Sequence, residues 1–398
     1  MTDRNTENAN QILMIAGEVS GDLHASGLLR EFLKIQPGFH CFGVGGNRMK
    51  AEGFDPLFHV EDVAFLGLSE VVTHLPLIRR MMKTLLRECH RRKPRAVVLI
   101  DYPGFNLRFA DQLRREPLLR DIPILYYISP QVWAWRASRV PKIARLVDRM
   151  AVIFDFEVPI YQKAGLKTDF VGHPLLEVTQ PTSSKDDFRR RLGVGADDLL
   201  LALLPGSRMQ EVNRLFPLFL NTYREISRNF PDIKAAVGCS PSLKKSYYEN
   251  LLSKCDINSA WPFLLSGETY DLLAHSDVAL VASGTATLET AILGTPMVMA
   301  YKVAPLTYWV GRHLVKIPNI ALVNVVAGNK VVPEFIQQDA TPGRIAAELG
   351  NILTDDNRRQ RMISDLTKVR QKLGRPEASR NVAAILNEMI SNRVARAE

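Results

Sequence analysis

Two stretches of the sequence place a polar side chain directly after an apolar, strand-like run, where parallel α/β sheets bind their ligands. In LIDYPGFN (99–106), Asp101 follows such a run and precedes a Pro-Gly turn. A carboxylate there can act as general base for an attacking hydroxyl, or it can cap the next helix. In ALLPGSRMQEV (202–212), Arg208 follows a second run, and its guanidinium can neutralise a diphosphate. The alternative is a surface arginine after a tight turn.

A third stretch, VASGTATLETAILGTP (281–296), has the pattern of a strand, a Ser-Gly-Thr turn and a helix. Free N–H groups and the helix dipole make such a turn suitable for an anion. Glu289 lies one helical turn after Thr285, where it can accept both hydroxyls of a ribose. A capped helix with a solvated glutamate would have the same pattern. Two anion-suited loops on one sheet edge favour the functional interpretation.

The first strand-like run is followed by an acidic loop, AGEVSGDLHASG (16–27). Its Glu18, Ser20 and Asp22 are better suited to sugar hydroxyls and N–H groups than to a phosphate, and either acid can instead cap the following helix. The sequence also lacks the G-x-x-x-x-G-K-[ST] and G-x-G-x-x-G phosphate motifs, and it has no D-x-D triplet. Kinase, ATPase and nicotinamide-dependent functions therefore lose their main support, and we expect no metal and no cofactor.

The elements that must position these residues follow a strand–helix rhythm, which predicts α/β domains with parallel sheets. Helical patterns occupy about 24–35 and 107–115. The expected strands are 12–16, 96–101, 124–129, 150–154, 168–172, 199–206, 233–238, 277–283 and 296–301. The polar, turn-rich segment 177–198 interrupts the rhythm and predicts a linker between domains 1–176 and 199–340. A charged helical tail, 341–398, follows.

Composition narrows the class of protein. The chain has 398 residues, 46% of them hydrophobic, and a formal charge of +9, which points to an anionic partner such as nucleic acid, a membrane surface or a phosphorylated substrate. Its four cysteines are scattered without metal-binding spacing. The polar N-terminus is no signal peptide, and no apolar run approaches the ~18 residues that span a bilayer. We expect a cytoplasmic protein.

Two further motifs suit an interface. LPLIRRMMKTLLRECHRRKPR (75–95) is an amphipathic helix with an apolar stripe, typical of a helix packed on a sheet. The excess of basic residues beside the stripe suits an anionic bilayer surface. These basic residues include Arg79, Arg80, Lys83 and Arg87. In SPQVWAWRASRV (129–140), Trp133 and Trp135 adjoin arginines, which suits a sugar phosphate or a lipid, although buried tryptophans would look the same.

Together these motifs resemble one family closely: the lipid-A-disaccharide synthases, which are inverting, metal-independent glycosyltransferases with the two-domain GT-B fold. The motifs that carry the resemblance are AGEVSGD, GVGGNRMKAEG, LIDYPGFN, YYISPQVWAW, LLPGSRMQEV and LVASGTATLE. They occur in order from residue 12 to about residue 335. The resemblance implies two Rossmann-like domains with parallel sheets facing a central cleft. It also implies an enzyme peripherally associated with the inner membrane.

The resemblance implies transfer of 2,3-diacylglucosamine from its UDP donor to 2,3-diacylglucosamine 1-phosphate, giving the β-1,6 lipid A disaccharide precursor and UDP. It makes 1–176 the acceptor and membrane-side domain and 199–340 the UDP-sugar domain, closing about 172–177. In this scheme Asp101 is the base and Arg208 stabilises the leaving UDP. The donor contacts are Gly206, Ser207, Arg208, Ser283, Gly284, Thr285, Glu289 and Asn324, and the acceptor side has Glu18, Ser20, Asp22 and Asn106.

The chain departs from the family pattern at Gly104, where many members have an acidic residue, so Asp101 is the only carboxylate in DYPGFN. His173, at the expected hinge, is interpreted as a loop histidine rather than a catalytic one. A homodimer is compatible with the resemblance. Two other classes stay open: a UDP-GlcNAc 2-epimerase, which needs no basic amphipathic surface, and a nucleic-acid-binding protein. The second would leave the strand-end carboxylates unexplained, and we expect no nucleic acid as partner.

Overall fold

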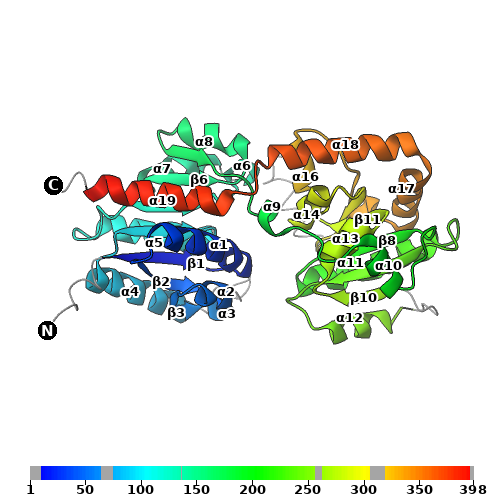
Figure 1. Cartoon of the computed structure of the whole chain (residues 1–398), viewed down its shortest axis with the longest axis horizontal. Coiled ribbons are helices and arrows are strands. Elements are labelled where there is room, and N and C mark those ends of the chain that lie inside the picture. Colours follow the sequence, from blue (N-terminus) through cyan, green and yellow to red (C-terminus); the bar gives the residue numbers. More distant parts are fainter. Residues whose placement is uncertain (1–9, 64–74, 136, 256–261, 305–318, 395–398) are drawn as a thin grey trace. The chain divides into compact units, whose positions relative to one another are not determined.

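The computed structural model describes residues 10–63, 75–135, 137–255, 262–304 and 319–394. The chain forms two units: one comprises 1–174 with 375–398, and the other comprises 175–374. Each is an α/β unit built on a parallel sheet (Figure 1). The central strands form because they are aliphatic runs buried on both faces, as parallel sheets require; examples are β1 (Gln11–Ala16), β4 (Ala96–Ile100), β8 (Leu200–Leu204) and β11 (Val278–Ala282).

In the first unit the described strands form one parallel sheet in the order β3-β2-β1-β4-β5-β6-β7. The strands are β1 (Gln11–Ala16), β2 (His40–Gly45), β3 (Asp55–His59), β4 (Ala96–Ile100), β5 (Ile124–Tyr127), β6 (Arg149–Val152) and β7 (Lys167–Phe170). The winding direction reverses between β1 and β4, which pair with Ala16 opposite Ile100. Such a reversal is where doubly wound sheets hold their ligands.

Helices cover both faces of this sheet. The helical elements are α1 (Val19–Ile35), α2 (Asn47–Ala51), α3 (Val60–Val63), α4 (Leu75–Arg92), α5 (Pro103–Arg115), α6 (Val132–Trp135), η1 (Ala137–Arg139), α7 (Val140–Leu146), η2 (Asp155–Glu157), α8 (Val158–Gln162) and α19 (Ala378–Val394). Alternate strand residues pack with α4, α5, α7 and α8 into one core. The helix α19, red in Figure 1, lies along α1.

In the second unit the described strands run in the order β10-β9-β8-β11-β12-β13 and are again parallel. They are β8 (Leu200–Leu204), β9 (Lys234–Cys239), β10 (Phe263–Ser266), β11 (Val278–Ala282), β12 (Met297–Tyr301) and β13 (Glu334–Ile336). The helical elements are α9 (Leu175–Val178), α10 (Lys185–Arg191), α11 (Met209–Ile226), α12 (Lys245–Leu252), α13 (Thr269–His275), α14 (Ala286–Leu293), α16 (Leu322–Ala327), η3 (Gln337–Asp339), α17 (Pro342–Thr354) and α18 (Asp356–Lys372). The winding reverses between β8 and β11.

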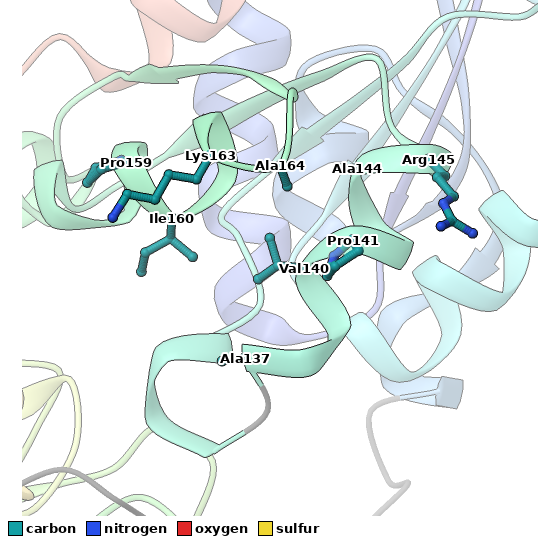
Figure 2. A pocket seen from close by; sticks show the side chains of 9 residues that line it. All are labelled: Ala137, Val140, Pro141, Ala144, Arg145, Pro159, Ile160, Lys163 and Ala164. Carbon is teal, nitrogen blue, oxygen red and sulfur yellow. The ribbon is translucent and has the colours of Figure 1, made fainter.

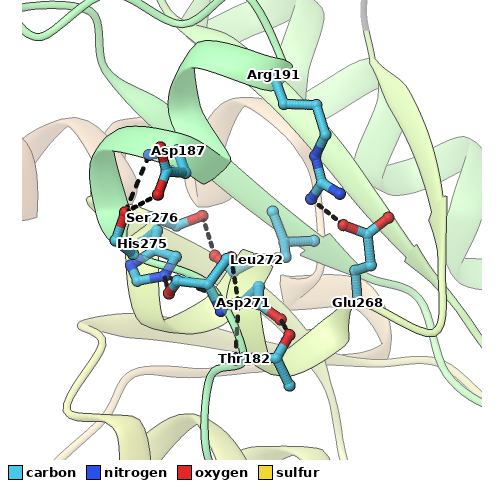
Figure 3. A network of polar contacts seen from close by, with 10 residues as sticks. Thr182, Asp187, Arg191, Glu268, Asp271, Leu272, His275 and Ser276 are labelled. Carbon is cyan, nitrogen blue, oxygen red and sulfur yellow. Dashed lines mark hydrogen bonds and ion pairs between the residues drawn. The ribbon is translucent and has the colours of Figure 1, made fainter.

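The segment expected as a linker, 177–198, is instead part of the second unit. Its Thr182 and Ser183 donate backbone and hydroxyl hydrogen bonds of 2.5–2.9 Å to the buried carboxylate of Asp271 (Figure 3). The His275 ring lies 2.9 Å from the Ser183 carbonyl oxygen, and Arg191 pairs with Glu268. These contacts, which sequence spacing does not reveal, fix the segment on α13.

The expected tail, 341–398, also divides differently. Helices α17 and α18 pack against α11 and α14 in the second unit, whereas α19 belongs to the first. The Arg149 guanidinium ties α19 to the first sheet by pairing with Asp169 at 2.7 Å and with Glu388 at 2.5 Å. The tail is therefore shared between two cores rather than forming a separate helical piece.

Candidate active site

Asp101 lies at the carboxyl end of β4, on a backbone that few residues adopt. Asp101 and Tyr102 have φ angles of 45° and 47°, in the left-handed region. A residue held there costs of order 1–3 kcal/mol and persists only where its surroundings fix it. Here the Asp101 N–H donates to the Tyr127 carbonyl at 2.9 Å, and the Tyr126 hydroxyl donates to the Asp101 carbonyl at 2.6 Å. Strained backbone of this kind clusters at functional sites.

The turn after β1 is shaped to receive Tyr102. A Cβ on Gly17 would lie 2.2 Å from a ring carbon of Tyr102, so only glycine fits there. Burial, followed by the charge of Glu18, raises the pKa of Asp101 to about 7 and that of Tyr102 to about 12. Glu18 and Asp101 are therefore close enough to repel each other, and the loops after β1 and β4 form one acidic site.

Two residues expected on the acceptor side have structural roles instead. The Asp22 carboxylate accepts hydrogen bonds from the backbone N–H groups of Gly46, Arg48 and Met49 at 2.7–3.1 Å and thereby caps α2. Asn106 is fully buried, and its amide donates to the Asp101 carbonyl at 2.8 Å and the Ile100 carbonyl at 3.2 Å. Both side chains are buried and bonded within the chain, so in this structure their polar groups serve the protein and not an open surface. Asn106 is a positioning residue for Asp101.

The other acceptor-side residues remain accessible. Glu18 and Ser20 are both exposed at the start of α1. Gly104 is also exposed, and a Cβ at this position would have no neighbour within 4 Å. His173 is 4% exposed and packs on the Phe154 ring, and burial lowers its pKa to about 3. It is therefore a neutral, buried histidine.

In the second unit, Arg208 ends the loop between β8 and α11. Gly206 has a φ of 110°, and a Cβ there would lie 2.8 Å from the Glu211 carboxylate. That carboxylate accepts from the N–H groups of Ser207 and Arg208 at 3.2 and 3.3 Å, holding the loop closed. The Arg208 side chain is 80% exposed, and its guanidinium lies 3.6 Å from Glu211. It is free to meet an anion beyond the sheet edge.

The Ser283–Thr285 turn follows β11, the neighbour of β8. Gly284 has a φ of 138°, Ser283 is half-buried, and Thr285 is exposed. Glu289 is half-buried on α14, where it accepts a 3.1 Å hydrogen bond from the Tyr270 hydroxyl, and burial raises its pKa. The two loops expected to bind the donor thus occupy the winding reversal of this sheet.

Asn324, expected among the donor contacts, has its polar atoms engaged within the chain. Its side chain is fully buried on α16. The amide donates to the Val332 carbonyl at 2.9 Å and the Glu334 carboxylate at 2.7 Å, while its oxygen accepts from the N–H groups of Val331 and Val332. Both N–H donors and the oxygen are satisfied within the chain. Asn324 therefore fixes the chain at 331–334. The Glu334 carboxylate in turn accepts from the Ile320 N–H at 3.1 Å, and the Ile320 carbonyl accepts from the Ser283 hydroxyl at 3.4 Å.

Several residues of these sites were not expected from the sequence. Glu211 had a detectable signal, since it stands three residues after the residue that precedes α11, the spacing of a capping box. Tyr102, Tyr270 and Glu157 had none. Glu157 is 1% exposed and accepts from the Ser129 hydroxyl at 2.7 Å and the Trp133 indole at 3.0 Å. Trp133 therefore anchors its loop; the Trp135 side chain lies outside the described residues.

Among the described residues, no helix combines the length and apolar character needed to cross a bilayer. Within the same residues, no group of three or more His, Cys, Asp or Glu side chains is arranged to hold a metal ion.

Comparisons with known proteins bear on both sequence and fold. The family model for lipid-A-disaccharide synthetase matches residues 12–389. A lipid-A-disaccharide synthase of Syntrophus aciditrophicus (strain SB) is 44% identical over 383 residues, covering 96% of this chain and 98% of that protein.

Two solved structures share the fold. The UDP-GlcNAc 2-epimerase of Neisseria meningitidis bound to UDP-GlcNAc has a TM-score of 0.62 at 12% identity, covering 95% of this chain and 100% of that one. MurG of Acinetobacter baumannii has a TM-score of 0.54 at 14% identity, covering 95% and 99%. At such identities the likeness concerns the fold alone. The expected α/β class, with two parallel-sheet Rossmann-like domains of the GT-B type, is confirmed.

Proposed function

Because the chain belongs to the lipid-A-disaccharide synthase family, we propose that it transfers 2,3-diacylglucosamine from UDP to the 6-hydroxyl of 2,3-diacylglucosamine 1-phosphate. Membership makes it a glycosyltransferase of lipid A biosynthesis; the two acylated substrates and the residue roles are our proposal. The observation that carries these roles is the placement of Asp101 and Arg208, each on a loop at the winding reversal of its own sheet.

We assign UDP to the second unit. The Ser283–Thr285 turn and Arg208 would contact the diphosphate, with Gly206 and Ser207 shaping the loop. Glu289 would accept the ribose hydroxyls while Tyr270 holds its carboxylate in place. The fold relative from N. meningitidis is itself bound to UDP-GlcNAc, which supports a uridine nucleotide.

We assign proton abstraction to Asp101 in the first unit. A general base is most effective when its pKa lies near the working pH, and burial together with Glu18 raises the pKa of Asp101 to about 7. The exposed Glu18 and Ser20 would hydrogen-bond the acceptor sugar. The Asp101 carboxylate takes the proton of the 6-hydroxyl, the oxygen attacks the anomeric carbon with inversion, and UDP leaves with the bonding electrons.

The experiment that tests this proposal is mass spectrometry of the product formed from UDP-2,3-diacylglucosamine and 2,3-diacylglucosamine 1-phosphate. We expect a tetraacyl disaccharide 1-phosphate together with UDP. If the protein instead turns over only unacylated UDP-GlcNAc, giving the 2-epimer, the epimerase alternative is correct. A control with UDP-GlcNAc as donor checks that transfer depends on the acyl chains.

The pH dependence of transfer should reflect the ionisation of the Asp101 carboxylate. Only the ionised carboxylate can accept a proton, so kcat/KM should rise with pH through about 7 and then level off. In Glu18→Gln the rising limb should move to lower pH, because the charge that disfavours the ionised form of Asp101 is gone. Glu31→Gln, on the helix α1 that follows Glu18, is the control. If the rising part of the pH profile is unchanged in Glu18→Gln, the titrating group is one other than Asp101.

We further propose that the helix α4 lies on an anionic membrane surface. Its apolar stripe packs into the sheet core through Met81, Leu85 and Cys89, as predicted. Arg79, Arg80 and Lys83 are exposed and form no ion pair within the described residues, whereas the exposed Arg87 lies 4.0 Å from Glu88. Cations without acidic partners favour a phospholipid surface. The proposed assembly is a homodimer at the inner membrane.

Charge reversal on α4 should release the protein from anionic vesicles. Each surface cation contributes about 1 kcal/mol to binding an anionic membrane, so reversing Arg79, Arg80 and Lys83 to glutamate should weaken binding at least ~100-fold. The measurement is co-sedimentation with vesicles containing phosphatidylglycerol. The matched control reverses Arg190, Arg228 and Lys368 in the second unit. Equal loss in both triple variants would show a response to net charge rather than to α4.

A further inference from the structure

The first unit has a hollow on its surface that none of the roles above uses. It is open, has a volume of about 670 Å³ and lies between α7 and α8 beside η1 (Figure 2). This volume is in the range of small-molecule sites. The apolar residues that line it include Val140, Pro141, Ala144, Pro159, Ile160 and Ala164.

The two helices leave this surface apolar because of how they pack. Ile143 on α7 and Tyr161 on α8 point into the sheet core and are at most 1% exposed. Their neighbours Ala144 and Ile160 pack against the margin of this core and remain partly accessible. Ala144 and Ala164 are small, so the space between the helices is left unfilled.

Two cations lie at opposite ends of the hollow, Lys163 beside Ile160 and Arg145 at the far end of α7 (Figure 2). Both are exposed, and neither has an ion pair or a side-chain hydrogen bond within the described part of the chain. Some arginines of this unit are paired, as in the 2.6 Å contact of Arg114 with Asp148, whereas Arg145 resembles Arg79 and Arg80 on α4 in having no acidic partner among the described residues. The hollow thus combines an apolar floor with uncompensated positive charge at both ends.

We propose that this hollow binds an acyl chain of an anionic phospholipid at a bilayer surface, with the lipid phosphate at Arg145 or Lys163. The amphipathic occupant matches the apolar floor and the cationic ends. A second copy of this chain fits less well, because its net charge of +9 repels a cationic rim. The helices α7 and α8 pack into the same core as α4, so the hollow and the basic residues of α4 belong to one face of the sheet. This contact does not depend on the transfer reaction.

The test uses the full chain and vesicles of phosphatidylcholine with or without phosphatidylglycerol. Reversing Arg145 and Lys163 to glutamate should weaken binding to the anionic vesicles at least ~10-fold, at about 1 kcal/mol per cation, with little change on phosphatidylcholine alone. Its control reverses Arg228 and Lys368 in the second unit. Ile160→Ser should also weaken binding, whereas Leu118→Ser, which removes a side chain that is 84% exposed outside the hollow, should not.

A second measurement locates the lipid directly. A phosphatidylglycerol with a photoreactive acyl chain should crosslink to peptides within 137–164, and the crosslink should disappear in Ile160→Ser. Circular dichroism checks that each variant is folded. The absence of a crosslink within 137–164, or equal binding by Ile160→Ser and Leu118→Ser, would overturn the proposal. So would altered sedimentation of the hollow variants in the absence of lipid, which indicates a second copy as the occupant. Loss of transfer to detergent-dispersed substrate would also overturn it.

Discussion

Asp101→Asn should reduce transfer by about 10²- to 10⁴-fold while leaving UDP binding nearly unchanged. The amide has the shape of the carboxylate but cannot accept the proton of the attacking hydroxyl. Asparagine is also one of the few residues that tolerates the left-handed backbone of this position, so the strained turn is retained. The measurements are single-turnover transfer and calorimetric titration with UDP.

The control for this variant is Asp111→Asn on α5, which makes the same chemical change away from the sheet edge and should transfer at the wild-type rate. Asp101→Ala is the less informative variant, because it also alters the backbone preference of the turn. Wild-type turnover in Asp101→Asn would place the base elsewhere. An equal loss of transfer and of UDP affinity would indicate that Asp101 contacts the donor rather than the acceptor.

Arg208→Ala should reduce kcat by about 10²- to 10³-fold, the range found when one group that stabilises developing charge is removed. The effect should not arise from misfolding. The side chain is 80% exposed, and its 3.6 Å contact with Glu211 is a surface pair of ~0–1 kcal/mol. Thermal denaturation should therefore give nearly the wild-type Tm. Arg208→Lys should recover only part of the rate, since an ammonium group cannot bind a diphosphate in bidentate fashion.

Glu289→Gln is the contrasting variant in the same domain. It keeps an acceptor for the Tyr270 hydroxyl but loses the charged hydrogen bonds to the ribose, so UDP affinity should fall about tenfold. Arg208→Ala should change kcat more than UDP affinity, and Glu289→Gln the reverse. If both variants lose affinity alone, Arg208 binds the donor without assisting departure of UDP.

The sequence predicted the apolar strands of both sheets better than the strands that are short or contain glycine or proline. All nine expected strands are present within a few residues, and most of them are apolar runs between turn residues. The strands β2, β3, β10 and β13 were not predicted. β2, HCFGVG, contains two glycines, β3 begins with Asp-Pro, and the other two have only three or four residues. Their pairing with longer neighbours decides their conformation, and that pairing is non-local.

For the candidate site, the sequence located the loops but not the directions of their side chains. Asp22 caps a helix that begins 25 residues later, at Asn47, and Asn324 binds a segment beyond its own helix. Hydrogen-bond partners that lie so far along the chain cannot be inferred from the sequence around Asp22 or Asn324. Arg208 and Glu289 differ from them only in having part of the side chain accessible, and accessibility is a property of the folded chain. The close approach of Tyr102 to Gly17 could not be predicted either, because it depends on the left-handed backbone at Asp101 and Tyr102.

The return of α19 to the first unit has a consequence for how the protein is made. Residues 1–174 leave the ribosome first, yet α1 and the Arg149 guanidinium have their partners on α19, near the end of the chain. N-terminal domains usually fold before the rest of a chain has been synthesised. Here the first-made half cannot be completed until the second has been translated. During that interval the surface of α1 that later receives α19 is uncovered, and it is then that a nascent chain would need protection by a chaperone.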